Sequence, residues 1–492
     1  MKIKIDNSNP AGKKTEMLCG FVLESTEKIL GLNKIDSKIA DSVRLSLKDN
    51  HGELGKITVF PTNNKAPAKR ILLAGIGKKE KISNDTLRFV AGKIAQKASE
   101  LKLKEISIIS PPSFVSDPVL SNSQIIEGCK MSLYKFDKFK AKKEGTTPDI
   151  SIMVAKSNKI SKAIKSSEII SDGVIFTRSI ANLPPNECTP TTLSGFAKDI
   201  ARKNKLKCVV ISKTELKKKG FGGIAAVGQG SKNEPKLIVI EYKGGPRNEK
   251  PTVLVGKAVT FDTGGISLKP GEKMDEMKFD KCGGCTVLGI MKAVSELQLK
   301  KNVVGIIPSV ENMPGGESYR PGDIIKLYNG KTAEILNTDA EGRLILADAL
   351  AYGEKHYSPK AIIDFATLTG ACIIALGNNV AAIVSNDEQL KQKIIQSSNS
   401  TTEEIWELPI NDDYMEMIKS EVADIKNIGI GRAAGTITAA AFLRNAIENT
   451  PWVHVDIAGV AWTQLATKPK PYNPKGATGF GVRLILDYLQ KT

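Results

Sequence analysis

The chain has 492 residues, of which 41% are hydrophobic and 25% are charged. These shares are those of an ordinary globular protein, and they exclude a mainly disordered, collagenous or coiled-coil chain. The net charge of +18 raises DNA or another anionic surface as a partner, although a lysine-rich surface alone would explain it and aromatic residues make up only 5%. Seven cysteines at low density do not form a disulfide scaffold, so we expect a reducing, cytoplasmic location.

Residues 1–157 hold most of the excess charge, with a net of +11 against +7 for the rest of the chain. Apolar patterning in this part predicts a strand over 70–77, a helix over 85–103 and a strand over 106–109. Alternating strands and helices are typical of an α/β domain, and any phosphate-binding role would be expected here. A helix over 158–183, ended by two prolines, is predicted to connect this domain to a second one.

Residues 184–492 form the second and larger predicted domain. Val- and Ile-rich runs alternate there with helical patterns; the strand-like runs are 237–241, 253–262, 303–310, 361–367 and 453–457, and the helix-like runs are 286–299 and 344–355. Strands separated by helices predict a mainly parallel sheet flanked by helices, so the expected fold class is α/β with two domains. In such sheets, ligands bind at the carboxyl ends of the strands.

Two other apolar stretches resemble targeting or membrane segments only superficially. The run 17–23 is short and is followed at once by Glu24, so we do not expect a signal peptide. The stretch 365–384 contains two glycines and two asparagines, and it predicts a buried strand and loop rather than a membrane span. The chain contains no HExxH zinc motif and no glycine motif for phosphate binding.

Charged residues are rare in the strand-like run 253–262, where Lys257 and Asp262 are the only two. A strand this apolar is expected to be buried on both faces. Burial penalises an ammonium group and favours a neutral amine, which can bind a metal ion. The alternative is a lysine at a strand end whose amine reaches solvent.

Further charged residues lie after a glycine pair or at the predicted starts of helices; they are Lys269, Asp280, Asp339, Glu341 and Arg343. Together with Asp262 they supply four carboxylates, which would repel one another in one pocket unless two divalent cations were present. Oxygen-rich ligation suits Mn²⁺, Mg²⁺ or Zn²⁺, so the pattern indicates a dinuclear hydrolase. The helix dipole disfavours a cation at the start of a helix. The position of Arg343 would be explained if this residue binds an anion. The alternative is a capping loop with solvated charges.

Residues 255–269 (VGKAVTFDTGGISLK) and 337–344 (NTDAEGRL) resemble the cytosol (leucyl) aminopeptidase family, of which the second block is the signature. Segments 364–370, 454–459 and 476–479 are also similar, and the resemblance covers residues from about 180 to 492. It implies a catalytic domain that removes N-terminal residues, preferably Leu and other apolar ones, from peptides. The reaction would use a hydroxide that bridges two metal ions, and it would contribute to intracellular peptide turnover.

The resemblance also implies the metal ligands. Lys257 and Asp280 would bind one ion, and Asp339 would bind the other. Asp262 and Glu341 would bridge both ions, which would be Mn²⁺ or Zn²⁺. The free amine of the peptide would bind a metal ion, which would explain why the enzyme acts at an N-terminus.

The catalytic and specificity residues follow from the same resemblance. Lys269 would polarise the scissile carbonyl, and Arg343 would hold a bicarbonate ion that acts as general base. The side-chain pocket would be formed by small or apolar residues, namely Met277, Thr367, Gly370, Ala458 and Ala461.

The family implies a homo-oligomer, usually a hexamer, with no membrane partner, and some members bind DNA. Two rival functions remain open: a dinuclear phosphoesterase, and a DNA-binding protein that keeps an old catalytic domain without activity. Cys282 and Cys285 depart from the family pattern close to Asp280, which gives the hypothesis that oxidation of these thiols inhibits the enzyme.

Overall fold

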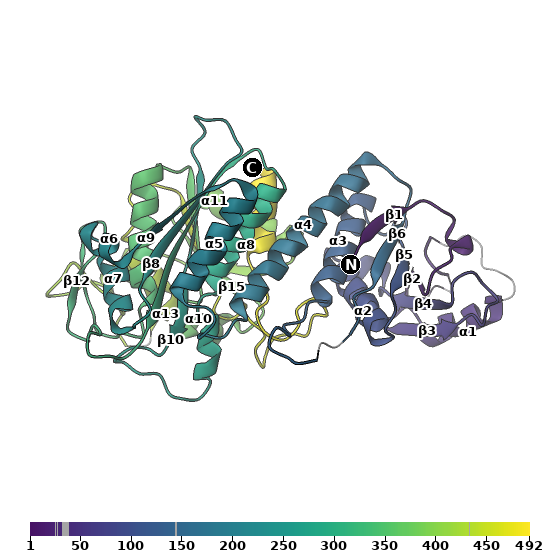
Figure 1. The fold of residues 1–492 in the computed structure, drawn as a ribbon, viewed down its shortest axis with the longest axis horizontal. Coiled ribbons are helices and arrows are strands. Elements are labelled where there is room, and N and C mark those ends of the chain that lie inside the picture. The colour runs from purple at the N-terminus through teal and green to yellow at the C-terminus, as the bar shows by residue number, and fades with distance from the viewer. Residues whose placement is uncertain (25, 27, 32–38, 143–144, 432) are drawn as a thin grey trace. The chain divides into compact units, whose positions relative to one another are not determined.

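The computed structural model describes residues 1–24, 26, 28–31, 39–142, 145–431 and 433–492 (Figure 1). The chain forms two compact units, one made of Met1–Asp172 with Pro469–Pro474 and the other of Gly173–Lys468 with Lys475–Thr492. The long helix α4 (Asn158–Ala181) runs through the point of division. Both units are α/β structures, which confirms the fold class predicted from the sequence.

The N-terminal unit is built on a six-stranded sheet in the order β1-β6-β5-β2-β4-β3, in which only β3 is antiparallel to its neighbour. Its strands are β1 (Ile3–Asp6), β2 (Leu18–Val22), β3 (Ile57–Pro61), β4 (Arg70–Gly75), β5 (Glu105–Ile109) and β6 (Asp149–Met153), and its helices are α1 (Ala40–Asn50), α2 (Thr86–Glu100) and α3 (Pro118–Ser132). Along β4, Leu72 and Ala74 join the core with α2 and α3, whereas Ile71 and Leu73 join the core with α1. Successive side chains of a strand point to opposite faces, so helices pack against both faces of the sheet.

The C-terminal unit contains a nine-stranded sheet with the path β16-β15-β18-β14-β9-β11-β8-β7, and β10 pairs with β11 off this path. The central strands β18, β14, β9 and β11 are parallel, whereas β15 and β8 are antiparallel to their inner neighbours. The strands are β7 (Lys207–Ile211), β8 (Lys236–Lys243), β9 (Thr252–Gly256), β10 (Ala258–Asp262), β11 (Asn302–Asn312), β14 (Ala361–Ala366), β15 (Ala381–Ser385), β16 (Ile405–Glu407) and β18 (Trp452–Asp456).

Helices cover both faces of this sheet (Figure 1). On one face α8 (Cys282–Glu296) packs with α5 (Pro190–Asn204) and α14 (Val482–Lys491), and α14 packs with α11 (Glu388–Thr401). On the other face α9 (Gly342–Tyr357) packs with α7 (Gly222–Val227) and α13 (Gly435–Arg444). Smaller elements complete the unit: α6 (Lys213–Lys218), α10 (Gly370–Leu376), α12 (Asp412–Glu416) and a sheet of β12 (Ile324–Lys326), β13 (Thr332–Glu334) and β17 (Ile425–Lys426).

The strand predicted over 253–262 is two strands in the structure, because the chain changes partners at Lys257. The Lys257 amide donates to the Phe365 carbonyl of β14 at 3.0 Å, which ends the pairing of β9 with β14. Beyond it, β10 pairs with β11, with an irregular register between Val259 and Asp262. The break leaves Lys257 at the carboxyl end of β9 and Asp262 at the carboxyl end of β10.

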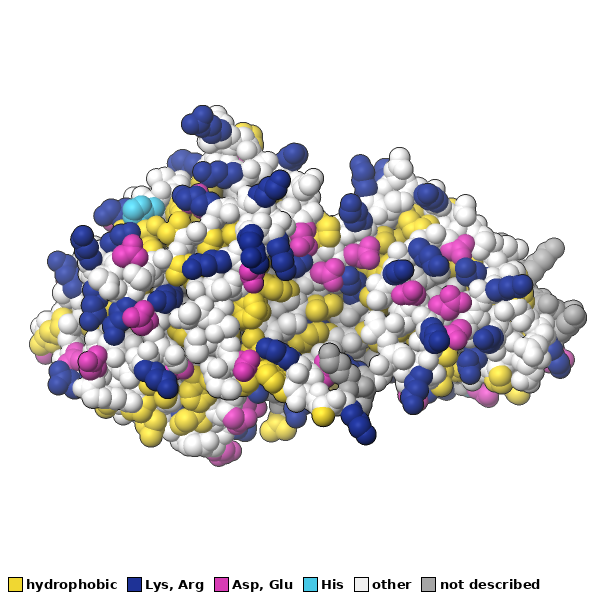
Figure 2. Space-filling view, in the orientation of Figure 1, with side chains coloured by type: hydrophobic (Ala, Val, Ile, Leu, Met, Phe, Trp, Pro, Cys, Tyr) yellow, Lys and Arg dark blue, Asp and Glu magenta, His cyan; other side chains and the backbone are white. Residues whose placement is uncertain are grey.

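The two apolar stretches noted in the sequence contribute strands to the sheets, and the second also contains a short helix. Residues 18–22 form the buried strand β2, and residues 365–384 run from the end of β14 through α10 into β15. Within the residues that the structure describes, no helix is long and apolar enough to cross a membrane. In Figure 2, Lys and Arg side chains are spread over this face of both units, with acidic side chains among them, rather than gathered on the N-terminal unit alone.

Candidate metal centre

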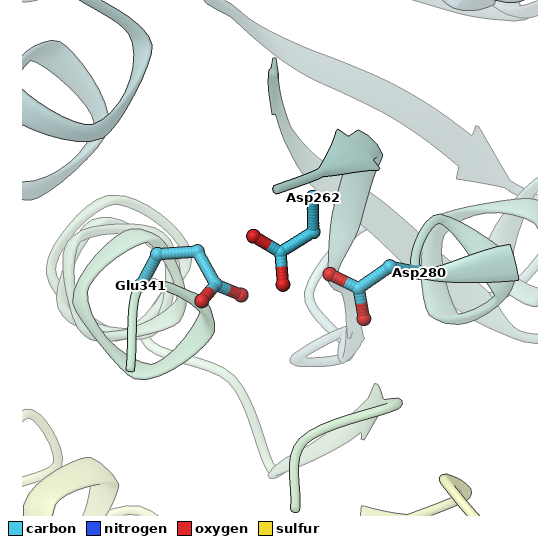
Figure 3. A group of neighbouring side chains, drawn as sticks. All are labelled: Asp262, Asp280 and Glu341. Carbon is cyan, nitrogen blue, oxygen red and sulfur yellow. The ribbon is translucent and has the colours of Figure 1, made fainter. Parts of the chain in front are cut away.

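Three carboxylates come together beside the carboxyl end of β10. One is the last residue of that strand, and the other two lie at the ends of helical segments. Asp262 is the last residue of β10, and Asp280 follows the short helix η5 (Met274–Phe279). Glu341 is the residue that precedes α9. Figure 3 shows the three carboxylates pointing toward one another, and each offers an oxygen within 4.8 Å of those of the other two. The expected clustering of these residues is therefore what the structure shows.

Lys257 lies in the middle of this cluster. Its Nζ donates to Asp280 Oδ1 at 2.9 Å, to Glu341 Oε1 at 2.8 Å and to the Thr367 carbonyl at 3.0 Å. A Cβ at Gly342 would lie 2.7 Å from this Nζ, so the first turn of α9 can approach the lysine only with glycine at that position.

Lys269 completes the cluster from the loop after β10. Its Nζ lies 2.9 Å from Asp262 Oδ2 and also contacts Asp339 Oδ1. The loop reverses through Gly264 and Gly265, whose φ angles of 87° and 67° favour glycine. The cluster therefore contains four carboxylates and two lysines, which lie at strand ends, at helix ends or in the adjoining loops.

Opposite charges decide the protonation of the lysines. Burial alone would lower the pKa of Lys257, but the carboxylates of Asp280, Glu341 and Asp262 outweigh it and raise this pKa. Lys269 is raised in the same way by its own carboxylate neighbours. Burial alone would make Lys257 a neutral amine, but its carboxylate neighbours keep it charged. Lys257 would therefore be neutral only if a metal cation bound these carboxylates in place of the ammonium group.

The pKa values of two carboxylates are raised as well, which favours their neutral form. Burial raises the pKa of Asp280 well above its usual range, and the neighbouring Glu341 and Asp262 add to the effect. Burial and the charges of Asp262 and Glu341 raise the pKa of Asp339 to about 7. Negative charge is thus in excess here, as the sequence argument required.

The residues present fit a divalent cation. Asp280 Oδ2 and Glu341 Oε2 are buried and have no hydrogen-bond donor among the residues that the structure describes. Buried carboxylate oxygens without a donor are costly unless a cation binds them. Carboxylate oxygens with one amine form a donor set suited to Mn²⁺ or Zn²⁺.

Arg343 lies in the first turn of α9 and is buried. One of its terminal N–H groups donates to the Asn427 carbonyl at 2.7 Å, whereas its Nε has no acceptor within the described part of the chain. Burial lowers its pKa to about 10, so the side chain is still a cation at neutral pH. A buried cation with a free N–H donor at the start of a helix is suited to binding an anion.

The residues expected to form a side-chain pocket lie on three segments near the cluster. Met277 precedes Asp280 by three residues, and its carbonyl accepts from the Asp280 amide at 3.2 Å. Thr367 donates from Oγ1 to Asp280 Oδ1 at 2.7 Å, and Gly370 begins α10 with open space where a side chain would stand. Ala458 and Ala461 are buried just after β18.

Sequence reasoning missed two residues that organise these loops. Asn312 ends β11 and donates from Nδ2 to Asp262 Oδ1 at 2.8 Å. Asp456 ends β18 and accepts from the amides of Leu368 and Ala458, both at 3.1 Å, and from Thr369 Oγ1 at 2.7 Å. Their position offered a signal, because both are polar residues at the carboxyl end of an apolar strand.

Cys282 and Cys285 lie in the first turn of α8 and are buried. Burial raises the pKa of Cys282 to about 12 and that of Cys285 well above its usual range. Oxidants attack the thiolate, which burial disfavours here. Inhibition by thiol oxidation stays a prediction, and the surroundings of both thiols oppose it.

Comparisons with known proteins identify the family to which the chain is similar. Residues 175–486 match the catalytic domain of the cytosol aminopeptidase family, and residues 21–143 match its N-terminal domain. A probable cytosol aminopeptidase of Cenarchaeum symbiosum (strain A) is 59% identical over 490 residues, covering 100% of this chain and 99% of the relative. A probable cytosol aminopeptidase of Syntrophotalea carbinolica is 43% identical, covering 89% of each chain. The bottromycin maturation enzyme BotP in complex with Mn superposes with a TM-score of 0.86 at 27% identity, covering 97% of this chain and 99% of that one.

The fold, the acidic cluster and these similarities define a metal-dependent hydrolase with an α/β catalytic domain. The chain belongs to the cytosol aminopeptidase family, and it is an aminopeptidase whose substrates are peptides.

Proposed function

We propose that this aminopeptidase removes N-terminal Leu and other apolar residues from peptides with the help of two divalent metal ions, Mn²⁺ or Zn²⁺. One observation carries the proposal: Asp262, Asp280 and Glu341 meet in a buried cluster that includes oxygens without donors. Lys257 and Asp280 would hold one ion and Asp339 the other, with Asp262 and Glu341 shared between them. Two divalent ions would supply four positive charges, which match the four carboxylates once Lys257 binds an ion as a neutral amine.

Each remaining polar group has a task in peptide hydrolysis. When bound, the two ions supply a water of lowered pKa and polarise the peptide carbonyl. Lys269 is a cation at the edge of the cluster, and it would stabilise the negative charge that develops on the scissile carbonyl oxygen. Arg343 would hold a bicarbonate ion as general base, because its buried Nε is free to donate.

Specificity for an apolar side chain would come from Met277, Thr367, Gly370, Ala458 and Ala461. The Asp456 carboxylate supports two of these segments, because it binds the amides of both Leu368 and Ala458. Small side chains at 370, 458 and 461 leave room for a Leu- or Met-sized residue. Larger side chains introduced at Gly370 would reduce cleavage of Leu substrates before that of Ala substrates.

Two assays on the same preparation test the proposed function. Elemental analysis of the purified protein should find two divalent ions per chain. Leucine p-nitroanilide should be cleaved and p-nitrophenyl phosphate should not, because the phosphoesterase is the rival that two metal ions also suit. Phosphatase activity without peptidase activity, or a chain that binds no divalent ion, would contradict the proposal.

We also propose a homohexamer that acts in intracellular peptide turnover in the cytoplasm. This rests on the family, whose relatives named cytosol aminopeptidase match this chain along nearly its whole length. Light scattering of the full chain should give six times the mass of 53.1 kDa. A stable monomer with full activity would contradict the proposed hexamer but would leave the proposed metal centre unaffected.

A further inference from the structure

Asn312 connects two of the segments that carry the proposed metal ligands, the end of β10 and the segment of Asp339. It is fully buried at the end of β11, beside Asp262 in the register of β10 with β11. Its Nδ2 donates to Asp262 Oδ1 at 2.8 Å and to the Thr338 carbonyl at 3.1 Å. Thr338 directly precedes Asp339, so one amide group bonds to both ligand-bearing segments.

The surroundings fix the orientation of this amide. Both neighbours of Nδ2, a carboxylate and a carbonyl, can only accept, so the NH₂ side must face them. Asn312 Oδ1 lies on the opposite side, where a Cβ at Gly265 would be 2.8 Å away, and it has no donor among the described residues. A flipped amide would place its oxygen against two acceptors, which is unfavourable.

The result is a carboxylate whose rotation is restricted. Asp262 Oδ1 accepts from the Gly264 amide at 2.9 Å as well as from Asn312, which occupies both lone pairs of that oxygen. Asp262 Oδ2 lies 2.9 Å from Lys269 Nζ, and it is the oxygen of this carboxylate that remains for metal ions. Without Asn312, the carboxylate would lose one of the two donors that set its plane.

We propose that Asn312 is a positioning residue for the metal centre, which orients Asp262 and holds its loop against the segment of Asp339. The proposal rests on the proposed two-metal function. Groups that orient a metal ligand change metal affinity by about 10- to 100-fold when they are removed. Because Asp262 is shared between the two positions, we expect Asn312 to affect binding at both.

The test uses three full-length variants in the metal-free form. Asn312→Ala removes the amide, and Asn312→Leu removes it while keeping a branched side chain of similar size. Tyr319→Phe is the matched control, because Tyr319 Oη donates to the same Thr338 carbonyl at 2.7 Å without bonding to Asp262. Thermal melting of each variant checks that the fold is intact, and if the alanine variant does not fold, the leucine variant decides.

The first measurement is Mn²⁺ affinity, by competition with a chelating dye. We expect affinity to fall by about 10- to 100-fold in both Asn312 variants and to stay near the wild-type value in Tyr319→Phe. Wild-type affinity in Asn312→Leu would mean that the residue only fills space, and would overturn the proposal. Equal losses in Tyr319→Phe would overturn it as well, because the effect would then act through Thr338 rather than through Asp262.

The second measurement is cleavage of leucine p-nitroanilide over a range of Mn²⁺ concentrations. A positioning role predicts that excess Mn²⁺ restores most of kcat in the Asn312 variants, with KM close to wild type. A kcat that stays low at saturating Mn²⁺ would overturn it. Wild-type protein that binds no Mn²⁺ would overturn the proposed function itself, whereas wild-type protein that binds two ions beside an unaffected Asn312→Leu would overturn the role of Asn312 alone.

Discussion

Buried charge is arranged in opposite ways in the two units of this protein. In the N-terminal unit, Arg88 contacts Asp85 Oδ1 at 2.7 Å and Glu127 Oε2 at 2.8 Å, with Lys470 at 3.8 Å from Asp85. There, two cations face two carboxylates. In the metal centre, four carboxylates face two lysines among the residues that the structure describes. Balanced charge serves stability, whereas the imbalance leaves room for further cations.

The pKa values of two aspartates express this difference. Burial alone would raise the pKa of Asp85, but Arg88 and Lys470 outweigh it and the pKa is lowered. Burial raises the pKa of Asp280, and Lys257 does not compensate because Glu341 and Asp262 act against it. The same residue type is therefore stabilised as an anion in one unit and destabilised in the other. A raised carboxylate pKa beside other carboxylates indicates a functional site, although structural networks can also cause one.

The largest effect is expected for Asp262→Ala, which removes a carboxylate shared by both proposed ions. Metal content should fall to background at both positions, and peptidase activity should be lost with it. Elemental analysis and leucine p-nitroanilide cleavage measure the two quantities on one sample. Asp85→Ala is the matched control, because it removes a partly buried carboxylate from the balanced network and should keep both ions. Retention of one ion in Asp262→Ala would show that Asp262 serves a single position.

A smaller effect, on stability alone, is expected for Arg88→Met. The variant keeps the size of the side chain but removes the guanidinium from the buried Glu127 carboxylate and from the partly buried Asp85 carboxylate. Breaking a buried ion pair from one side costs about 3–5 kcal/mol, which urea unfolding would measure. Metal content and kcat of the folded variant should be unchanged. Loss of metal from the folded variant would refute the separation of the two charge networks.

The sequence predicted the architecture well because apolar periodicity is a local property. The helix predicted over 158–183 is α4 (Asn158–Ala181), and the strand predicted over 303–310 is the centre of β11 (Asn302–Asn312). The break at Lys257 escaped prediction because both sides of it are equally apolar. It arises from pairing with Phe365, which is more than a hundred residues away.

The candidate site was predictable to the extent that chemistry is carried by residue type. Burying carboxylates and lysines in apolar surroundings costs free energy, so such residues indicate a function. Resemblance to a family motif then implies the role of each residue. Asn312 and Asp456 gave only the weaker signal of a polar residue at a strand end, and an amide or a lone acid is common where a strand passes into a loop. Their importance comes from bonds to residues far along the chain, such as Asp262 and Leu368.

Within the metal centre, Lys269→Ala separates catalysis from metal binding. We expect kcat to fall by about 10²-fold or more, as it does when a donor to a developing oxyanion is lost. Both ions should remain, because the carboxylates that would hold them are untouched. Measured together, metal content and kcat decide the role. If the ions were lost instead, Lys269 would act by holding Asp262 and Asp339 in place.

The last effect is a pH dependence of stability, and it concerns Asp348, a buried carboxylate of the C-terminal unit that accepts from backbone N–H groups. Its oxygens accept from the Tyr328 amide at 2.8 Å and the Ile224 amide at 2.9 Å, yet burial raises its pKa to about 7. The folded state therefore retains a proton that the unfolded chain releases near the ordinary aspartate pKa of 3.8. Stability from this group is present below that value and is lost as the pH rises through 7.

Comparison with Asp348→Asn isolates this titration, because every other titrating group is common to both proteins. The stability of wild type relative to the variant should fall between about pH 4 and pH 7, by at most about 1.4 kcal/mol per pH unit, in urea unfolding of metal-free protein. Asp85→Asn should give the opposite sign, because a lowered pKa stabilises the fold above the usual aspartate range and this stability is lost on acidification. If both differences had the same sign, then burial rather than the neighbouring cations would control the carboxylates of both units, and the contrast between balanced and unbalanced charge would not hold.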